Sequence, residues 1–210
     1  MAIVLVIVGV LLGGLIVPIT TQLDARKRTQ AETQLREVEQ ALLGFAASTG
    51  RLPCPATATS AGLPAPNVAT TACTTANGFV PVRALGLQGA VDGSGRLLDP
   101  WLNPLRYSIS AAGGGTYTSS IPLALVPDLT ICEDSACSVV IADAVVAIVI
   151  SQGEDGSTTT SADQLENVDG DLIFVERLRT ELTGAEFDDH LVWISPNTLT
   201  YQLVRAGRFN

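Results

Sequence analysis

The chain opens with Met1–Val17, MAIVLVIVGVLLGGLIV, a run without a charged or polar side chain. A helix rises about 1.5 Å per residue, so this run spans roughly 25 Å, close to the lower limit for crossing a bilayer's hydrocarbon core. A cleaved signal peptide would carry basic residues before such a run and a small-residue site after it, and Val17-Pro18-Ile19 is a poor cleavage context. We therefore expect a retained, single-pass membrane anchor.

Two glycines and a proline give this segment its predicted packing features. Gly9 and Gly13 form a G-x-x-x-G pair, and small residues at that spacing let helix backbones approach closely in an apolar medium. Glycine is also tolerated in membrane helices without a packing role, so the spacing alone supports both interpretations. Pro18 removes a backbone donor and is expected to kink or loosen the helix without ending it.

The helix is predicted to continue well beyond the anchor. Over residues 20–49 the composition turns polar, yet apolar residues recur at spacings of three and four: Leu35, Val38, Leu42 and Phe45. Gly50 provides a C-terminal stop and Pro53 prevents resumption. The stripe is too short for a coiled coil, so we expect an amphipathic half that docks on a folded head.

Residues 50–210 read as that head. Residues 51–99 are rich in Pro, Ala, Thr and Gly and predict a long ordered loop region. Strand-like runs follow at Leu105–Ser110, Val139–Ser151, Asp171–Leu178 and Leu191–Ser195, with Val145–Ile150 as the best candidate for a central strand. A last helix, Pro196–Ala206, is capped by Ser195. The expected fold is α+β, a long helix packed on a small, mainly antiparallel sheet.

Charge and cysteines limit the function classes. With 21 acidic against 12 basic residues the formal charge is −9, which excludes a general nucleic-acid binder. The cysteines form two local sets, Cys54 with Cys73 and Cys132 with Cys137, and we expect local disulfides that staple loops. A zinc site is the weaker alternative, because the one His is distant in sequence. Disulfides imply an oxidising compartment.

Three short blocks carry a resemblance to a known family. The opening helix with the turn Gly50–Pro55, GRLPCP, resembles the N-terminal part of type IV pilins and pseudopilins. Asp99–Tyr107, DPWLNPLRY, resembles the Asp-Pro-Trp-Gly-Asn-Pro-Tyr-x-Tyr segment of the major pseudopilin of type II secretion, with Leu102 and Leu105 in place of Gly and Tyr. Ser151–Gly156, SQGEDG, is similar to that family's Ser-x-Gly-x-Asp-Gly turn.

The resemblance implies a pilin-like fold and a structural subunit of a type II secretion pseudopilus or a related type IV filament. Such subunits are trimmed by a prepilin peptidase, held in the bacterial inner membrane with the head in the periplasm, and assembled with other pilin-like subunits through helices such as residues 1–19. A minor or adhesive pilin of a type IV pilus is one alternative. A membrane-anchored periplasmic binding protein that never polymerises is another.

The basic cluster Arg26-Lys27-Arg28 conflicts with a periplasmic head, since basic residues after an anchor favour the cytoplasmic side. The family's basic leader and cleavage glycine would lie before Met1 and would remove this conflict. We therefore expect upstream codons to encode a basic stretch, a glycine and an apolar segment ending in Glu.

An acidic stretch between Gly153 and Asp171 suggests a calcium site. By resemblance, Asp155 matches the aspartate of the family's turn, and Asp169 and Asp171 match its calcium-loop aspartate pair. Calcium takes six to eight oxygen ligands from a flexible turn, and the spacing is not that of an EF-hand. A solvated acidic loop is the alternative.

An enzyme is not expected. Asp188, Asp189, His190 and Ser195 are close in sequence, but nothing resembles a nucleophile elbow, and Ser195 reads as a helix cap.

Overall fold

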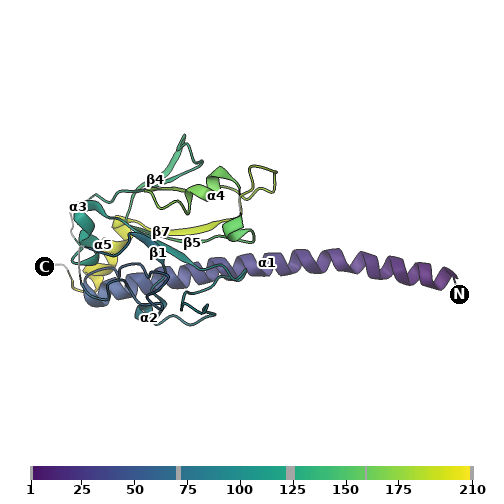
Figure 1. Ribbon diagram of the computed structural model, residues 1–210, viewed down its shortest axis with the longest axis horizontal. Helices are drawn as coiled ribbons and strands as arrows, with labels where there is room; N and C mark the ends of the chain where they lie inside the picture. The colour runs from purple at the N-terminus through teal and green to yellow at the C-terminus, as the bar shows by residue number, and fades with distance from the viewer. Residues whose placement is uncertain (1, 70–71, 122–125, 159, 209–210) are drawn as a thin grey trace.

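The computed structural model describes the backbone of residues 2–69, 72–121, 126–158 and 160–208; side chains are described from residue 22 onward, apart from residue 157 and the gaps just given. One long helix, α1 (Ala2–Thr49), runs along a head that contains two small β-sheets (Figure 1). The C-terminal half of α1 packs against the head, and its N-terminal half projects beyond it (Figure 1). This confirms the expected α+β class with mainly antiparallel strands.

Of the expected membrane or filament-core segment, residues 1–19, the part that the structure describes, residues 2–19, falls in the projecting half of α1. Its proposed packing residues Gly9, Gly13 and Pro18 lie outside the residues whose side chains are described, so their packing stays a prediction. Within the described part of the chain, no helix combines the length and the apolar character needed to cross a membrane.

The docked half of α1 is held by one buried stripe. Its members are Ala31, Leu35, Val38, Leu42, Leu43 and Ala46. Phe45, expected in this stripe, is only half-buried, and the Arg51 guanidinium lies over its ring at 5.3 Å from the centroid. The helix ends as predicted, because Gly50 adopts φ 76° and its N–H closes the last turn on the Ala46 carbonyl at 2.7 Å.

A four-stranded antiparallel sheet lies over α1. Its strands, in spatial order, are β1 (Asn77–Phe79), β2 (Arg106–Ile109), β5 (Ala147–Ser151) and β7 (His190–Ile194). The aliphatic strand β5 pairs on both sides, which confirms it as an inner strand. After β7, Ser195 caps α5 (Pro196–Arg205) by accepting a hydrogen bond from the Thr198 N–H at 3.2 Å.

A second, three-stranded sheet covers the far side of the first, with the order β4 (Val140–Val145), β3 (Leu129–Cys132) and β6 (Ile173–Val175). Here the prediction of one strand over Val139–Ser151 is wrong. Val145 pairs with Leu129 in this sheet, whereas Ala147 pairs with Ile109 and Ile194 in the other. Ala144 has φ 52° and lies between Ala142 and Val145, where the pairing of β3 with β4 shifts register, so it marks an irregularity within β4.

The remaining elements are short. They are the helices α2 (Val82–Leu85), α3 (Ala112–Gly115) and α4 (Ala162–Glu166) and the 3₁₀ turns η1 (Thr116–Thr118) and η2 (Gly156–Thr158). The expected loop region 51–99 is mostly irregular, but it contains β1 and α2. The strand expected at Asp171–Leu178 is confined to β6.

Strand β5 connects two hydrophobic cores, because alternate side chains of a strand point to opposite faces. Ala147 and Val149 join the core that α1 and α5 share with the four-stranded sheet. Ile148 and Ile150 join the core between the two sheets, with Leu129, Ile131 and Phe174 as neighbours. Each fully buried aliphatic side chain contributes about 1.5–3 kcal/mol to folding, so β5 stabilises both layers.

Candidate functional site

Two blocks of sequence that are some fifty residues apart meet at one junction. The buried Asp99 carboxylate accepts hydrogen bonds from the N–H groups of Trp101 and Asn103, both at 2.9 Å, and from the Ser151 hydroxyl at 2.7 Å. Asn103 Nδ2 in turn donates to the Gly153 carbonyl at 2.6 Å. The block at 99–107 and the turn at 151–156 therefore form a single structural unit.

Glycine is required on one side of this junction. Gly153 and Gly156 have φ 65° and 52°, and a Cβ added to either would overlap Asp188 or Asn103, respectively. Leu102 also adopts a left-handed conformation, with φ 73°, and its side chain is 71% exposed. A backbone conformation that glycine usually adopts therefore carries an apolar side chain on the surface here.

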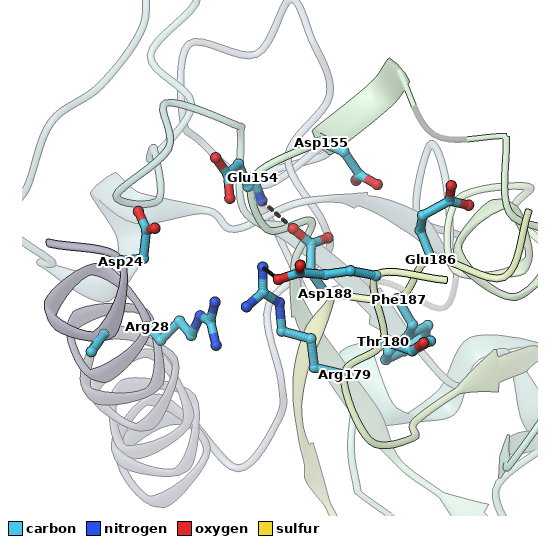
Figure 2. Close-up of a pocket in the computed structure, with 11 residues that line it drawn as sticks. Asp24, Arg28, Glu154, Asp155, Arg179, Thr180, Glu186, Phe187 and Asp188 are labelled. Atoms are coloured by element: carbon cyan, nitrogen blue, oxygen red, sulfur yellow. Dashed lines mark hydrogen bonds and ion pairs between the residues drawn. The ribbon is translucent and has the colours of Figure 1, made fainter. Parts of the chain in front are cut away.

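The turn at 151–156 lies beside α1 and borders a cavity of about 560 Å³ (Figure 2). Figure 2 shows Arg28 of α1 and Arg179 of the head pointing into the space between the two. Carboxylates outnumber these two guanidinium groups, since the acidic lining residues are Asp24, Glu154, Asp155, Glu181, Glu186 and Asp188. Arg179 is paired with Glu181 at 2.9 Å.

Asp188 organises the acidic side of this cavity. Its carboxylate accepts hydrogen bonds from the Glu154 N–H at 2.6 Å and from Gln164 Nε2 at 2.8 Å. Gln164 Nε2 also reaches Asp155 at 3.3 Å. Burial and the neighbouring Asp188 charge raise the pKa of Asp155 to about 6. Sequence reasoning missed Asp188 as a partner of Asp155, because more than thirty residues separate them.

The opposite flank of α1 borders a larger cavity of about 870 Å³. Helix residues such as Thr29, Thr33 and Glu37 line one wall, and the segment 98–102 lines the other. Gln34 Nε2 crosses from the helix to the Leu98 carbonyl at 2.9 Å. The two blocks therefore face α1 across two cavities, near the place where the helix leaves the head.

The three expected calcium ligands do not form one group. Asp169 and Asp171 lie with Glu166, and the carboxylate oxygens of these three residues are all within 4.8 Å of one another. Asp155 is not a member of this group and lies instead beside Asp188. Burial raises the pKa of Glu166, and the charges of Asp171 and Asp169 raise it further. Sequence reasoning placed Glu166 in the acidic stretch but did not select it.

Part of this acidic group already stabilises the loop. Asp169 accepts a hydrogen bond from the Asp171 N–H at 3.1 Å, and Asp171 accepts one from the Ile173 N–H at 2.7 Å. Three close carboxylates are chemically suited to a hard divalent cation, but calcium needs several further oxygens from carbonyl groups or water. The donor set therefore fits calcium in type and is incomplete in number.

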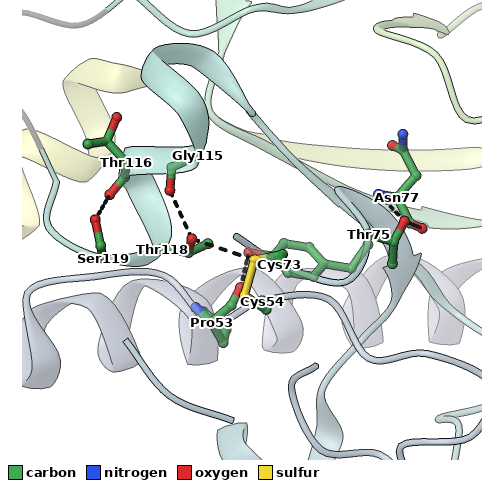
Figure 3. Close-up of a disulfide and its surroundings, with 10 residues drawn as sticks. Pro53, Cys54, Cys73, Thr75, Asn77, Gly115, Thr116, Thr118 and Ser119 are labelled. Atoms are coloured by element: carbon green, nitrogen blue, oxygen red, sulfur yellow. Dashed lines mark hydrogen bonds between the residues drawn. A yellow bond between two sulfur atoms is a disulfide. The ribbon is translucent and has the colours of Figure 1, made fainter. Parts of the chain in front are cut away.

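Both disulfides are local. Cys54 pairs with Cys73 and Cys132 with Cys137, with Cα–Cα distances of 5.5 and 5.0 Å. Figure 3 shows the first pair beside Thr118, whose hydroxyl donates to the Gly115 carbonyl at 2.9 Å. The Tyr107 hydroxyl donates to the Pro53 carbonyl at 3.2 Å, so the irregular segment after α1 is tied to β2. The second pair closes the turn between β3 and β4.

His190 and Ser195 have structural partners. The His190 ring stacks on Trp101 with centroids 6.1 Å apart, and burial lowers the pKa of His190. The Ser195 hydroxyl caps α5. Next to His190, the buried Asp189 carboxyl accepts a hydrogen bond from Asn167 Nδ2 at 2.7 Å, and burial raises its pKa to about 8.

No protein-family model, no curated protein and no solved structure matches this chain.

Proposed function

We propose that this protein is a structural subunit of a type II secretion pseudopilus or a related type IV filament, and that it assembles through the N-terminal half of α1. It acts by packing, not catalysis. Its partners are other pilin-like subunits, and its place is the bacterial inner membrane and the cell envelope, with the head in the periplasm. A prepilin peptidase would process it if an upstream leader exists.

One observation carries this proposal: α1 is a single helix whose two halves differ in environment. From about Ala31 onward, α1 packs against the head through a stripe of buried apolar residues, whereas the first half projects beyond it (Figure 1). The projecting half consists largely of the aliphatic run MAIVLVIVGVLLGGLIV. A helix that is apolar all round needs an apolar environment, which lipid or the helices of neighbouring subunits would provide.

The junction of the two head blocks supports the secretion branch. The resemblance to the major pseudopilin was noted in two separate stretches, and these stretches bond to each other through Asp99–Ser151 and Asn103–Gly153. Their position against α1 would fix the angle at which the helix leaves the head. Within the same proposal, Asp169, Asp171 and Glu166 are the carboxylates that would hold Ca²⁺, with Asp155 outside the group.

Photo-crosslinking in the native host tests this function. A photoreactive residue at Val10, in the projecting half, should give adducts that contain other pilin-like chains or further copies of this one. The same residue at Val204, which is exposed on α5, should give few such adducts. Gly13→Leu keeps the segment apolar and blocks close approach, so it should reduce the Val10 adducts severalfold while the chain stays in the membrane.

The adduct pattern also separates the alternatives. A ladder of increasing mass indicates a polymerising subunit, and single adducts with one other pilin-like chain indicate a minor pilin. Complete absence of adducts with pilin-like chains would contradict the proposal and favour the non-polymerising binding protein.

A further inference from the structure

The two edges of the three-stranded sheet differ in how their backbone N–H and C=O groups are hydrogen-bonded. At the β6 edge, Asn167 imitates a neighbouring strand: Oδ1 accepts from the Val175 N–H at 2.7 Å, and Nδ2 donates to the Val175 carbonyl at 3.1 Å. Asp171 accepts from the Ile173 N–H on the same strand. This edge is therefore closed by side chains.

The β4 edge is open. Among the residues that the structure describes, β3 is the only strand paired with β4. Three consecutive β-branched residues, Val139 just before the strand and Val140 and Ile141 at its start, are 51%, 52% and 46% exposed. The β3–β4 hairpin projects from the head on the side away from α1 (Figure 1), so neither α1 nor the first sheet covers it. A free edge with exposed β-branched side chains is a template for another strand.

The hairpin is also held in place. The Cys132–Cys137 disulfide closes its turn, and the Glu133 N–H donates to the Val139 carbonyl at 2.9 Å beside it. Asp134 bonds to the Ser138 N–H at 3.0 Å within the same turn. A strand that is already ordered costs less entropy to bind than a flexible one.

Charge specifies what can bind there. Residues 107–176, which include this whole sheet and α4, hold more than half of the chain's 21 acidic residues and no Lys or Arg. The next residue, Arg177, is a cation near the hairpin, and it is paired with Asp163 of α4. Glu133, Asp134 and Asp143 lie on the hairpin itself, and Asp143 is exposed on β4. A second copy paired edge to edge would bring acidic hairpins together, and like charges on paired strands repel. Anionic lipid and nucleic acid are disfavoured by the same charge.

We propose that the open edge of β4 is a docking site for an extended, basic segment of a different protein, which adds to the sheet next to β4. Backbone hydrogen bonds to β4 provide the affinity, contacts with Val139, Val140 and Ile141 favour β-branched side chains, and the acidic hairpin favours Lys or Arg between them. This partner is distinct from the subunits that the projecting half of α1 would contact, and the proposal does not depend on filament assembly.

A synthetic peptide tests the site directly. The probe is a fluorescent peptide in which four lysines alternate with three valines, and the control replaces the three valines by prolines. Both carry the same charge, but the three prolines remove three backbone N–H groups, fix φ at each of these positions and disfavour an extended, paired strand. Binding to the full chain in detergent micelles is followed by fluorescence anisotropy. We expect the valine peptide to bind about tenfold more tightly than the control and to slow amide exchange over residues 139–145.

Matched variants locate the contact. Val140→Lys and Ile141→Lys place a cation on either face of the open edge, and each should raise the Kd for the valine peptide about tenfold. Val204→Lys makes the same change at a 57% exposed valine on α5 and should leave the Kd within about twofold. Two edge variants are used so that misfolding of one, detected by its melting curve, leaves the other informative.

Three results would overturn the proposal. Equal binding of the proline peptide would mean that charge alone drives the contact. Unchanged amide exchange in β4 would place the peptide elsewhere. Self-association of the chain that Ile141→Lys abolishes would mean that the edge serves a second copy.

Discussion

The two sheets of the head are built on different principles. The four-stranded sheet is stabilised by apolar packing on both faces, with α1 beneath it and the second sheet above. The three-stranded sheet has short strands, one face toward the first sheet, a disulfide in its hairpin and one edge bonded to the side chain of Asn167. We infer that the inner layer, which is the four-stranded sheet with α1, supplies most of the stability. The outer layer, which is the three-stranded sheet, presents charge and an open edge to the surroundings.

The largest effect should come from the inner layer. Leu42→Ala removes a fully buried side chain from the α1 stripe and should lower the free energy of unfolding by about 2–5 kcal/mol, because a cavity remains. Gln40→Ala, an exposed position two residues earlier, should change it by less than about 0.5 kcal/mol. Urea unfolding of both variants gives the comparison, and equal effects would mean that α1 is not docked as described.

The disulfide Cys54–Cys73 should contribute more to stability than Cys132–Cys137 in the outer sheet. Cys54–Cys73 spans 19 residues and Cys132–Cys137 spans 5, so the first restricts the unfolded chain more. Replacing the first pair with Ser should cost about 3 kcal/mol and replacing the second about 2 kcal/mol. Calorimetric unfolding of both variants measures these two stability losses. A larger loss of stability for the Cys132–Cys137 variant would contradict the prediction.

The pH dependence should reside at the boundary between the layers. The pKa of Asp189 is about 8 in the folded protein, above the roughly 4 of an unfolded aspartate. The folded state therefore holds a proton that the unfolded state loses, and stability should fall as pH rises from about 4 to about 8. For this one group the slope is at most about 1.4 kcal/mol per pH unit.

Asp189→Asn should flatten this dependence, since the amide oxygen can still accept from Asn167 and does not ionise. Denaturant unfolding at several pH values measures it. An unchanged slope in the variant would assign the effect to other groups whose pKa is also raised, such as Glu176 at about 7.

The smallest effect concerns the acidic loop of the outer layer. Calcium at five times its Kd should raise the stability of chelator-treated protein by about 1 kcal/mol, and Asp169→Asn with Asp171→Asn should remove the gain. Asp155→Asn is the control, because Asp155 lies outside the carboxylate group. If calcium does not raise the melting temperature, the acidic stretch is a solvated loop and not a calcium site.

The sequence predicts the inner layer better than the outer one, for physical reasons. Leu35, Val38 and Leu42 repeat with the helical period and are buried as predicted. The aliphatic run at 145–150 is long enough to indicate an inner strand, which is confirmed for residues 147–150. The change of sheet at Val146 left no signal in the sequence, because Val145 and Ala147 belong to one continuous apolar run although they pair in different sheets. The outer strand β3 was not predicted, because four residues give too little periodicity to separate a strand from a loop. Strand β6 was predicted, but it is shorter than the expected run Asp171–Leu178.

The candidate site shows the same limit. The blocks at 99–107 and 151–156 were recognisable as motifs, but their hydrogen bonds to each other depend on the pairing of β2 with β5. Asp155, Asp169 and Asp171 are neighbours in sequence, yet α4 and its flanking turns separate the first from the other two. Proximity along the chain was a poor guide to proximity in space within this acidic stretch.

The central claim is that the aliphatic half of α1 remains part of the working protein and is buried by lipid or by other subunits. Fractionation of host cells that express the chain from its own locus, followed by N-terminal sequencing of the mature polypeptide, tests it most directly. The account predicts a polypeptide that retains its aliphatic helix through Val17 and leaves the membrane fraction only with detergent. A freely soluble polypeptide that begins beyond Gln22 would contradict it.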